Sequence, residues 1–427
     1  MTVVAGPVAA GRVVVVGQGY VGLPLSVRAV QVGHDVVGFD LDKHRTDQLR
    51  RGESFIDDIS DEDIVACLRT GRFTPTDDPG ELAGFRVAVV CVPTPLRDGA
   101  PDLSYIEESA RILAPHLTAG ACVVLESTTY PGTTEEVFGP ILEAGSGLEA
   151  GTDFHLGYSP ERIDPNNPTW RLQNTPKIVS GVDEDSAAAV RAFYDTIVDR
   201  TVPALGTREA ELAKLLENTF RHVNIALVNE LAMYCHELGI DVWSVVDMAA
   251  TKPFGFMKFT PGPGVGGHCL PIDPSYLSWQ VRRSLGRTFR FVEIANDVND
   301  NMPTYVAARV TEHLNRRKLA VNGSKVLLVG LTYKRNSGDA RQSPAVPVAH
   351  RLADLGAELS AIDPKVDAAD VPDGVQLVEC TPEVLSGSDV VVILTDHDDI
   401  DWELVARHAD RVLDTRNRLS GSGVDRL

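Results

Sequence analysis

A glycine-rich turn between a strand and a helix is the feature that most restricts the fold of this chain. Residues 13–16 are four valines, and glycines follow at positions 17, 19 and 22, before an apolar helical segment. We expect further strands, separated by helical segments, at residues 35–39, 87–92, 122–126 and 178–180. Such alternation is typical of a parallel sheet covered by helices on both faces. The sequence therefore predicts an α/β fold that opens with a Rossmann-like, doubly wound domain.

The same turn predicts a dinucleotide site. Gly17 would allow the tight turn, Gly19 the approach of the backbone to a pyrophosphate, and Gly22 close packing of helix on strand. The amides and the dipole at the helix N-terminus favour negative charge. Asp40 ends the second predicted strand, 18 residues after Gly22. A carboxylate there would accept hydrogen bonds from ribose hydroxyls and repel a 2′-phosphate, which favours NAD over NADP.

Two neighbouring cations leave this preference open. Lys43 and Arg45 follow Asp40 closely, and either could offset the repulsion of a 2′-phosphate. The alternative is a glycine-rich turn in an α/β fold that binds no cofactor.

A long helix is expected in the middle of the chain. From residue 209 to about residue 238 there is no Gly or Pro, and Gly239 would end the helix. Apolar residues recur at spacings of three and four, at Leu212, Leu216, Phe220, Val223, Leu227, Leu231 and Tyr234. This periodicity predicts an amphipathic helix.

Two polar residues of this helix are candidates for catalysis. Lys214 and Asn218 are four residues apart and therefore share one face. A cation and an amide donor together could stabilise a developing oxyanion. The alternative is a solvated helix face, which Asn224 and Asn229 make less favourable because they also interrupt an apolar segment.

The Pro- and Gly-rich segment at residues 261–274 contains a candidate nucleophile. Its glycines at 264, 266 and 267 would let the backbone approach a ligand closely. We expect Asp273 to cap a helix at residues 275–285, with Pro274 at its first position. Cys269 would then lie just ahead of a helix N-terminus, where the dipole favours the thiolate, although a cysteine taken alone is more often a small buried residue. His268, its sequence neighbour, is a candidate base for a Cys–His pair. Neighbours in an extended loop point apart, which favours a structural or substrate-contacting role over this catalytic alternative.

The last third of the chain predicts a second, smaller α/β domain. Residues 324–330 predict a strand that runs into a turn, without the glycine set of the first domain. A helix at 344–355 and strands at 359–363, 390–394 and 412–414 are expected to follow.

Composition excludes several other classes of protein. A formal net charge of -20 argues against nucleic-acid binding, which needs a basic face. No apolar stretch approaches the ~20 residues that span a bilayer, and the N-terminus lacks the basic region of a signal peptide. The six cysteines form no CxxC pair or zinc-type knuckle, so we expect no metal site and a reducing, cytoplasmic environment.

Seven motifs together resemble the UDP-glucose/GDP-mannose dehydrogenase family over essentially the whole chain. They are GQGYVGLPL (17–25), CVPTPL (91–96), ESTTYPGTTEE (126–136), YSPER (158–162), AKLLENTFR (213–221), GPGVGGHCLPIDP (262–274) and GLTYKRNSGDARQSP (330–344). The resemblance implies an NAD-binding domain at 1–206, a central helical and dimerising domain with the cysteine loop at 207–316, and a nucleotide-sugar-binding domain at 317–427. It also implies a homodimer through the central helix and a role in polysaccharide biosynthesis.

The chemistry implied by the resemblance is a four-electron oxidation of the C6 alcohol of a nucleotide sugar, with two hydride transfers to NAD and no released aldehyde. Cys269 would add to the C6 aldehyde to form a thiohemiacetal, which is oxidised to a thioester and released by water as the carboxylate. A thioester is activated toward water, whereas serine would not provide a comparably labile leaving group.

The resemblance also assigns roles to individual residues. Lys214 and Asn218 would hold the C6 oxygen, and Asp273 would orient Lys214 or a water. Glu161 would act as general base in thioester hydrolysis and Thr128 would fix the water, although alone they read as a surface carboxylate and a turn hydroxyl. The implied cofactor contacts are Gly17, Gly19, Tyr20, Val21, Gly22, Asp40, Arg45, Thr94, Thr128 and Arg341. The implied substrate contacts are Glu161, Arg162, Lys214, Asn218, Gly266, Lys334 and Arg416.

One departure from the glucose-specific members bears on the substrate. Those members commonly have a second Glu four residues after the first, where this chain has Pro165. Residues 159–165 are more similar to members that act on UDP-N-acetylhexosamines, and Arg162 could contact the acetamido group or the diphosphate. Residues 250–256 and 261–263 are similar to members that act on UDP-N-acetylglucosamine, which is the substrate we expect. UDP-glucose or another nucleotide hexose stays an alternative, as do a non-catalytic nucleotide-sugar sensor and a two-electron hydroxyacid dehydrogenase.

Overall fold

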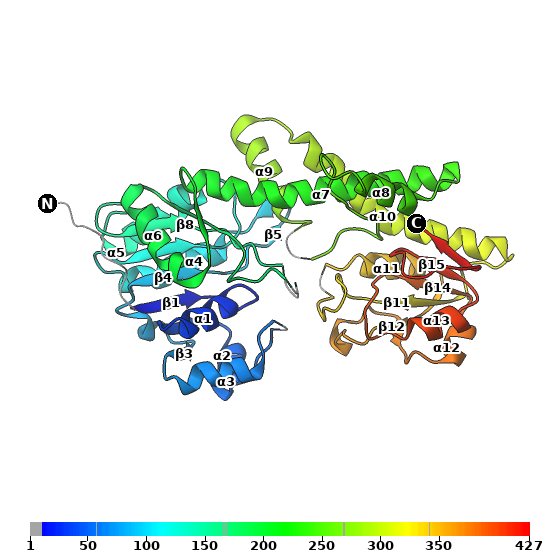
Figure 1. Ribbon diagram of the computed structural model, residues 1–427, viewed down its shortest axis with the longest axis horizontal. Helices are drawn as coiled ribbons and strands as arrows, with labels where there is room; N and C mark the ends of the chain where they lie inside the picture. Colours follow the sequence, from blue (N-terminus) through cyan, green and yellow to red (C-terminus); the bar gives the residue numbers. More distant parts are fainter. Residues whose placement is uncertain (1–10, 57, 165–166, 168, 268–269, 341) are drawn as a thin grey trace. The chain divides into compact units, whose positions relative to one another are not determined.

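The computed structural model describes residues 11–56, 58–164, 167, 169–267, 270–340 and 342–427. The chain divides into two compact units, Met1–Glu217 and Asn218–Leu427, called here the N-terminal and C-terminal units. Figure 1 shows the elements of each. Helix α7 (Thr207–Leu238) crosses from one unit to the other as a single helix of 32 residues, as the periodicity predicts.

The N-terminal unit contains an eight-stranded sheet in the order β10-β9-β8-β7-β4-β1-β2-β3. Its strands are β1 (Arg12–Val16), β2 (Asp35–Phe39), β3 (Phe73–Thr76), β4 (Val87–Val90), β7 (Cys122–Leu125), β8 (His155–Tyr158), β9 (Lys177–Gly181) and β10 (Thr201–Pro203). All neighbouring pairs are parallel except β8 and β9. The chain order reverses between β1 and β4, and α/β folds bind ligands at the carboxyl ends of strands at such a point.

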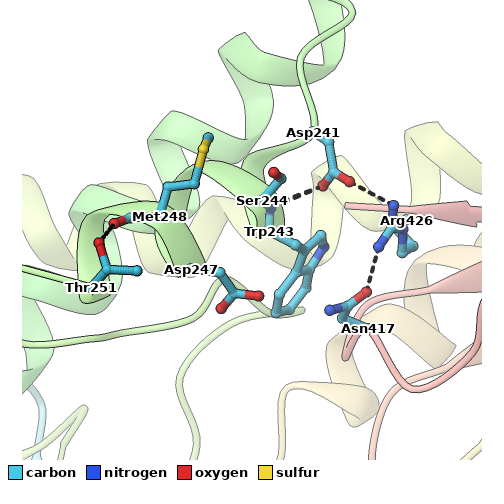
Figure 2. A pocket seen from close by; sticks show the side chains of 8 residues that line it. All are labelled: Asp241, Trp243, Ser244, Asp247, Met248, Thr251, Asn417 and Arg426. Carbon is cyan, nitrogen blue, oxygen red and sulfur yellow. Dashed lines mark hydrogen bonds and ion pairs between the residues drawn. The ribbon is translucent and has the colours of Figure 1, made fainter.

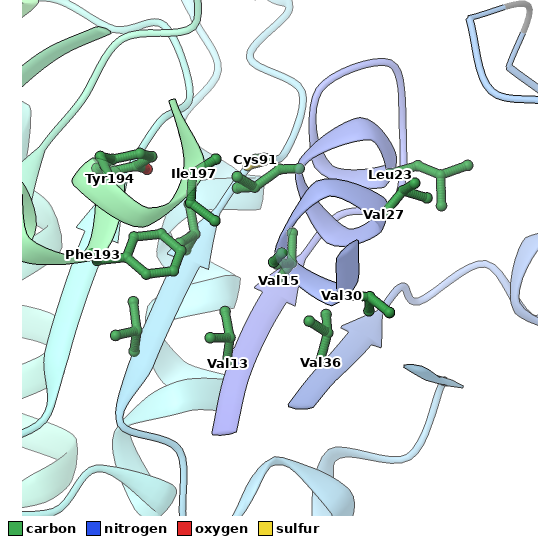
Figure 3. Packing of buried hydrophobic residues seen from close by; sticks show 14 of the residues in the cluster. Val13, Val15, Leu23, Val27, Val30, Val36, Cys91, Phe193, Tyr194 and Ile197 are labelled. Atoms are coloured by element: carbon green, nitrogen blue, oxygen red, sulfur yellow. The ribbon is translucent and has the colours of Figure 1, made fainter. Parts of the chain in front are cut away.

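Helices cover both faces of this sheet. They are α1 (Gly22–Gln31), α2 (Lys43–Arg51), α3 (Asp61–Arg69), α4 (Ser104–Leu113), α5 (Gly139–Ser146) and α6 (Glu184–Ile197), with short helical turns at Pro79–Leu82, Ala114–His116 and Thr134–Phe138 and a small hairpin of β5 (Leu96–Arg97) and β6 (Ala100–Pro101). The valines of β1 alternate between two cores: Val13 and Val15 join one, and Val14 and Val16 the other. Figure 3 shows the first core, where Val15 packs among side chains of α1 and α6. Burial on both faces explains the continuous valine run.

The C-terminal unit contains a six-stranded sheet, all parallel, in the order β13-β12-β11-β14-β15-β16. Its strands are β11 (Lys325–Val329), β12 (Glu358–Ile362), β13 (Val375–Leu377), β14 (Val390–Ile393), β15 (Val412–Asp414) and β16 (Val424–Arg426). Its helices are α8 (Val242–Ala250), α9 (Asp273–Leu285), α10 (Arg290–Arg316), α11 (Ala345–Asp354), α12 (Pro382–Ser386) and α13 (Trp402–His408), with a helical turn at Ala368–Asp370. The predicted α/β class with two doubly wound sheets and a long helix is confirmed. The division into three domains stays a prediction.

No helix in the described part of the chain combines the length and the apolar character that a membrane crossing needs.

Candidate active site

The glycines of the first turn meet different surroundings. Gly17 has a φ of +89°, and a Cβ there would lie 2.7 Å from the carbonyl oxygen of Cys91. A Cβ at Gly22 would lie 1.8 Å from the carbonyl oxygen of Gly17. A Cβ at Gly19 would have no atom of the described residues within 4 Å. Gly17 and Gly22 therefore allow the chain's own close packing, whereas the side of Gly19 is open to a ligand such as a pyrophosphate.

The carboxylate of Asp40 lies beside this turn. It accepts hydrogen bonds from the backbone N–H groups of Gln18 and Asp42, each at 2.9 Å. The guanidinium of Arg45 lies 3.6 Å from it and 5.5 Å from the centre of the Phe55 ring. The side chain of Asp40 is still 11% exposed. This geometry fits recognition of a ribose by Asp40. It also places the cation of Arg45 next to the carboxylate that is predicted to bind the cofactor.

The other predicted cofactor residues lie at the same edge of the sheet. Thr94 follows β4 and Thr128 follows β7, and both are half-buried. Tyr20 and Val21 belong to the glycine turn itself. Arg341 lies outside the described residues.

Glu161 belongs to a buried ionic cluster that sequence reasoning missed. The Nζ of Lys177 lies 2.8 Å from Oε1 of Glu126 and 3.5 Å from Oε2 of Glu161. The Tyr194 hydroxyl donates to Glu126, and the thiol of Cys91 lies 3.6 Å from it. Burial raises the pKa of Glu126. Burial opposes the charge on Lys177, but the two carboxylates outweigh it and raise the pKa of the ammonium.

Glu161 is not a surface carboxylate, the alternative that its sequence alone allowed, because the residue is only 9% exposed. Its Oε1 accepts a hydrogen bond from the backbone N–H of Ile163. The position of Lys177 beside Oε2 holds the carboxylate in one orientation, which a general base requires.

Arg162 is paired with the long helix. Its Nη2 lies 2.7 Å from Oε1 of Glu217 on α7, and its Nη1 donates to the carbonyl oxygen of Pro176 at 2.6 Å. The planar guanidinium thus ties the segment that carries Glu161 to α7. A substrate contact by Arg162 stays a prediction, and it would have to share the guanidinium with Glu217.

Lys214 and Asn218 are both buried, at 9% and 5% exposed. A solvated helix face is therefore wrong for these two positions. The amide nitrogen of Asn218 donates to Oδ2 of Asp273 at 2.5 Å. Among the residues that the structure describes, none forms a hydrogen bond or an ion pair with the ammonium of Lys214. A buried cation in this state is well suited to receive a developing negative charge.

The expected capping role of Asp273 is wrong by one position. Helix α9 begins at Asp273 itself, and the residue before it, Ile272, makes no side-chain capping bond. The carboxylate of Asp273 turns instead to Asn218. Its interaction is thus with the amide of α7, which makes it a candidate to orient Asn218.

Cys269 and His268 lie outside the described residues. The described part of the loop is anchored by Asn229, whose Oδ1 accepts the backbone N–H of Gly262 at 2.9 Å and whose amide donates to Asn299. The glycines of the loop pack against the chain itself: a Cβ at Gly266 or Gly267 would lie 2.9 Å from the side chain of Tyr333. A substrate contact by Gly266 stays a prediction.

Lys334 and Arg416 both lie at the carboxyl edge of the second sheet. Lys334 is half-buried in the segment that follows β11, and Arg416 follows β15. The Nε of Arg416 donates to the carbonyl oxygen of Leu394 at 2.7 Å. A Cβ at Gly262 would lie 2.9 Å from Nη1 of Arg416, so this cation lies beside the start of the cysteine loop.

A separate hollow with a volume of about 390 Å³ opens next to α8 and β16. Figure 2 shows Asp241 paired with Arg426, which also donates to Asn417 at 2.7 Å, beside the ring of Trp243. None of the predicted site residues that the structure describes lines this hollow. Across the described residues, no group of three or more His, Cys, Asp or Glu side chains is arranged to hold a metal ion.

Comparisons with known proteins agree with the motifs. Three profiles of the UDP-glucose/GDP-mannose dehydrogenase family match: the NAD binding domain at residues 11–198, the central domain at 208–301 and the UDP binding domain at 327–421.

Two curated relatives and one solved structure illustrate the similarity. The UDP-N-acetyl-D-glucosamine 6-dehydrogenase of Pseudomonas aeruginosa is 39% identical over 84% of both chains. The UDP-N-acetyl-D-mannosamine dehydrogenase of Pyrococcus horikoshii is 34% identical over 95% of both. A solved structure of a UDP-D-ManNAc dehydrogenase from Pyrococcus horikoshii superimposes with a TM-score of 0.89 at 33% identity, covering 97% of this chain and 98% of that one.

Proposed function

Because the chain belongs to the UDP-glucose/GDP-mannose dehydrogenase family, we propose that it oxidises the C6 hydroxyl of UDP-N-acetylglucosamine to a carboxylate. The chain is an NAD-dependent nucleotide-sugar dehydrogenase. The observation that carries the proposed chemistry is the buried arrangement on α7: an ammonium without a partner among the described residues at Lys214, and Asn218 fixed by Asp273.

These two side chains supply what the oxidation of an alcohol needs. The ammonium of Lys214 would neutralise the negative charge that develops on the C6 oxygen. One N–H of the Asn218 amide is held by Asp273, and an amide has two. The second N–H is thereby oriented and would donate to the same oxygen. NAD, when bound, would take up the hydride of each oxidation.

Cys269 gives the second oxidation its covalent intermediate. Its thiolate would add to the C6 aldehyde, forming the C–S bond of a thiohemiacetal, and loss of a second hydride would give a thioester. Water would then add at the acyl carbon as Glu161 takes up its proton, and the C–S bond would break. Each turnover thus consumes two NAD and one water, and yields two NADH and one carboxylate. The ion pair of Glu161 with Lys177 at 3.5 Å supports the base assignment, since it fixes the carboxylate.

The choice of UDP-N-acetylglucosamine rests on sequence similarity. The relative at 39% identity carries that name, while relatives named for UDP-N-acetyl-D-mannosamine reach 34%. The test is a panel of UDP-glucose, UDP-N-acetylglucosamine, UDP-N-acetylmannosamine, GDP-mannose and TDP-glucose with NAD, scored for NADH and acid. We expect turnover with UDP-N-acetylglucosamine and two NADH per acid. Turnover with UDP-glucose alone would contradict the substrate assignment.

The same assay separates the alternatives. A two-electron dehydrogenase would yield one NADH per product and no acid. A non-catalytic sensor would bind the sugar nucleotide equally well with Cys269→Ser and would form no acid with either chain. The proposed enzyme should lose acid formation with Cys269→Ser while it still binds UDP.

A homodimer through α7 is the second part of the proposal. The predicted apolar stripe of α7 is largely exposed, with Leu216 63% and Leu227 61% accessible. A second copy of the same helix would cover such a stripe by symmetry. Leu227→Glu should shift the mass measured by light scattering from dimer to monomer. Leu205→Glu is the matched control, because Leu205 is 98% exposed but precedes the helix.

A further inference from the structure

The two sheets repeat one local geometry. In the N-terminal unit, the N–H of Gly17 donates to the carbonyl oxygen of Phe39, and Asp40 follows. In the C-terminal unit, the N–H of Gly330 donates to the carbonyl oxygen of Ile362 at 2.9 Å, and Asp363 follows. Gly330 has a φ of +86°, close to the +89° of Gly17. Asp363 therefore occupies the position in the second sheet that Asp40 occupies in the first.

The second carboxylate is closed to a ligand. The side chain of Asp363 has an exposed fraction of 0%, against 11% for Asp40. Its Oδ2 accepts hydrogen bonds from the backbone N–H groups of Leu331 and Thr332, at 2.6 and 3.2 Å. The imidazole of His397 lies 3.2 Å from the same oxygen. A carboxylate with these partners cannot recognise a ribose as Asp40 would.

The hydrogen bonds of His397 define its tautomer. Its Nδ1 accepts the backbone N–H of Asn336 at 3.0 Å, so the proton of the neutral ring is on Nε2. Nε2 faces both Asp363, at 3.2 Å, and the hydroxyl of Thr332, at 3.0 Å. The ring thus connects the buried carboxylate on one side to the backbone of residue 336 on the other.

The short segment from Thr332 to Asn336 contains Lys334. Thr332 is held at its start, where its carbonyl oxygen accepts the hydroxyl of Thr395 at 2.5 Å. Asn336 is held at its end, where its amide donates to Asp398 at 2.7 Å and its Oδ1 accepts the N–H of Asp398. Lys334 therefore lies between two fixed points of a short segment.

We propose that His397 and Asp363 are positioning residues, which hold the Lys334 segment in the conformation that binds the diphosphate of the nucleotide sugar. The inference rests on the proposed function and on the contact of Lys334 with the diphosphate that the resemblance to the family implies. The equivalent acidic residues of the two sheets thus have different roles: Asp40 would bind a ribose, whereas Asp363 would fix the conformation of the Lys334 segment. Fixing the loop before binding lowers the entropic cost of immobilising Lys334 on the ligand.

Two isosteric variants of His397 separate its two hydrogen bonds. In His397→Asn, the side-chain oxygen can replace Nδ1 as acceptor for Asn336. In His397→Gln, the side-chain amide can replace Nε2 toward Asp363, but the acceptor for Asn336 is lost. Titration calorimetry with UDP should show binding ~tenfold weaker for His397→Gln, and within ~threefold of the unchanged chain for His397→Asn.

Enzyme kinetics provide the readout that a general loss of structure would not give. We expect the KM for the nucleotide sugar to rise with His397→Gln while the KM for NAD stays within ~twofold. His350→Gln is the matched control, since His350 is exposed on α11, and it should change neither. Equal UDP affinity in His397→Gln and the unchanged chain would overturn the inference, as would equal loss in the Asn and Gln variants.

A milder variant covers the case in which His397→Gln does not fold. Asp398→Ala removes the outer anchor of Asn336 at a side chain that is 51% exposed, and it should weaken UDP binding by ~threefold or more without a change in the KM for NAD. Unchanged UDP binding in that variant would overturn the inference. Failure of the unchanged chain to bind UDP and to oxidise any sugar of the panel would overturn the proposed function itself, and the inference with it.

Discussion

The ammonium of Lys177 lies 2.8 Å from the carboxylate of Glu126, and both residues are almost completely buried, at 3% and 1% exposed. Removing one partner of such a pair leaves a charge in a medium of low dielectric constant. Lys177→Met should therefore lower the free energy of unfolding by about 3–5 kcal/mol. Urea denaturation followed by circular dichroism measures this change.

Two variants serve as controls for this prediction. Lys258→Met removes the exposed pair of Lys258 with Asp247, whose side chains are 49% and 60% accessible, and it should cost no more than about 1 kcal/mol. Combining Lys177→Met with Glu126→Gln should recover part of the loss, because only the carboxylate of Glu161 then remains without the cation. Equal effects of Lys177→Met and Lys258→Met would contradict the importance of the buried pair.

The strands that the sequence predicts are those buried on both faces, because continuous valine and isoleucine runs identify them. In the first sheet, sequence reasoning missed the interior strand β8 (His155–Tyr158), whose four residues include no run of apolar side chains. It also missed β3 (Phe73–Thr76) and β10 (Thr201–Pro203), which lie at the two edges. Both edge strands contain proline, which an edge strand tolerates because one side of its backbone needs no partner. The weak pattern of these strands is therefore a consequence of their position.

The residues of the candidate site also differ in whether the sequence could identify them. Lys214 and Asn218 could be identified because helical spacing puts them on one face. Lys177 and His397 could not, because each acts through partners that are distant in sequence: His397 lies 34 residues from Asp363. The only local signal for Lys177 is a cation at the start of an otherwise apolar strand, which is common in exposed strands as well.

The bond between Asn218 and Asp273 predicts the effect of a nearly isosteric change. Asn218→Asp would place a second carboxylate 2.5 Å from Asp273, which would remove the donor to the C6 oxygen and raise the pKa of one of the two acids. We expect kcat with the preferred nucleotide sugar to fall by ~10²–10³-fold, with an unchanged KM for NAD. Steady-state NADH formation provides the measurement.

Asn224→Asp is the matched control in the same helix, since the Asn224 amide donates only to the backbone oxygen of Phe220 among the bonds that the structure shows. It should retain nearly full activity. If both variants lost activity to the same extent, a specific role for the Asn218 amide would be untenable.

The different surroundings of Gly19 and Gly22 predict different consequences of adding one methyl group. Gly22→Ala puts a Cβ 1.8 Å from the carbonyl oxygen of Gly17, so the turn must shift, at a cost of about 1–3 kcal/mol of stability. In Gly19→Ala the new methyl group meets no atom within 4 Å in the described part of the chain, so stability should be unchanged. Its methyl group would still occupy the side from which a pyrophosphate approaches, and the KM for NAD should rise ~tenfold or more.

Thermal unfolding and NAD saturation curves, measured on both variants, test this pair. A normal KM for NAD in Gly19→Ala would show that the open side of the turn does not receive the cofactor.

Glu211 predicts a dependence of stability on pH. Its carboxylate accepts hydrogen bonds from the backbone N–H groups of Gly132 and Thr134, at 2.6 and 2.9 Å. Burial nevertheless raises the pKa of Glu211 to about 7, from 4.5 in the unfolded chain. The folded state therefore holds a proton that the unfolded state has lost between pH 4.5 and 7. The contribution of Glu211 to stability is fully present below pH 4.5 and decreases by about 3 kcal/mol as the pH rises through 7.

Glu211→Gln removes this titration. We expect its free energy of unfolding, relative to the unchanged chain, to improve by about 3 kcal/mol between pH 4.5 and 8 in urea denaturation series. Glu209→Gln, at an exposed position of the same helix, should run parallel to the unchanged chain at every pH. A parallel curve for Glu211→Gln as well would mean that Glu211 has the same pKa in the folded and the unfolded chain, so that the two backbone N–H groups and the hydroxyl of Thr134 offset the cost of burial.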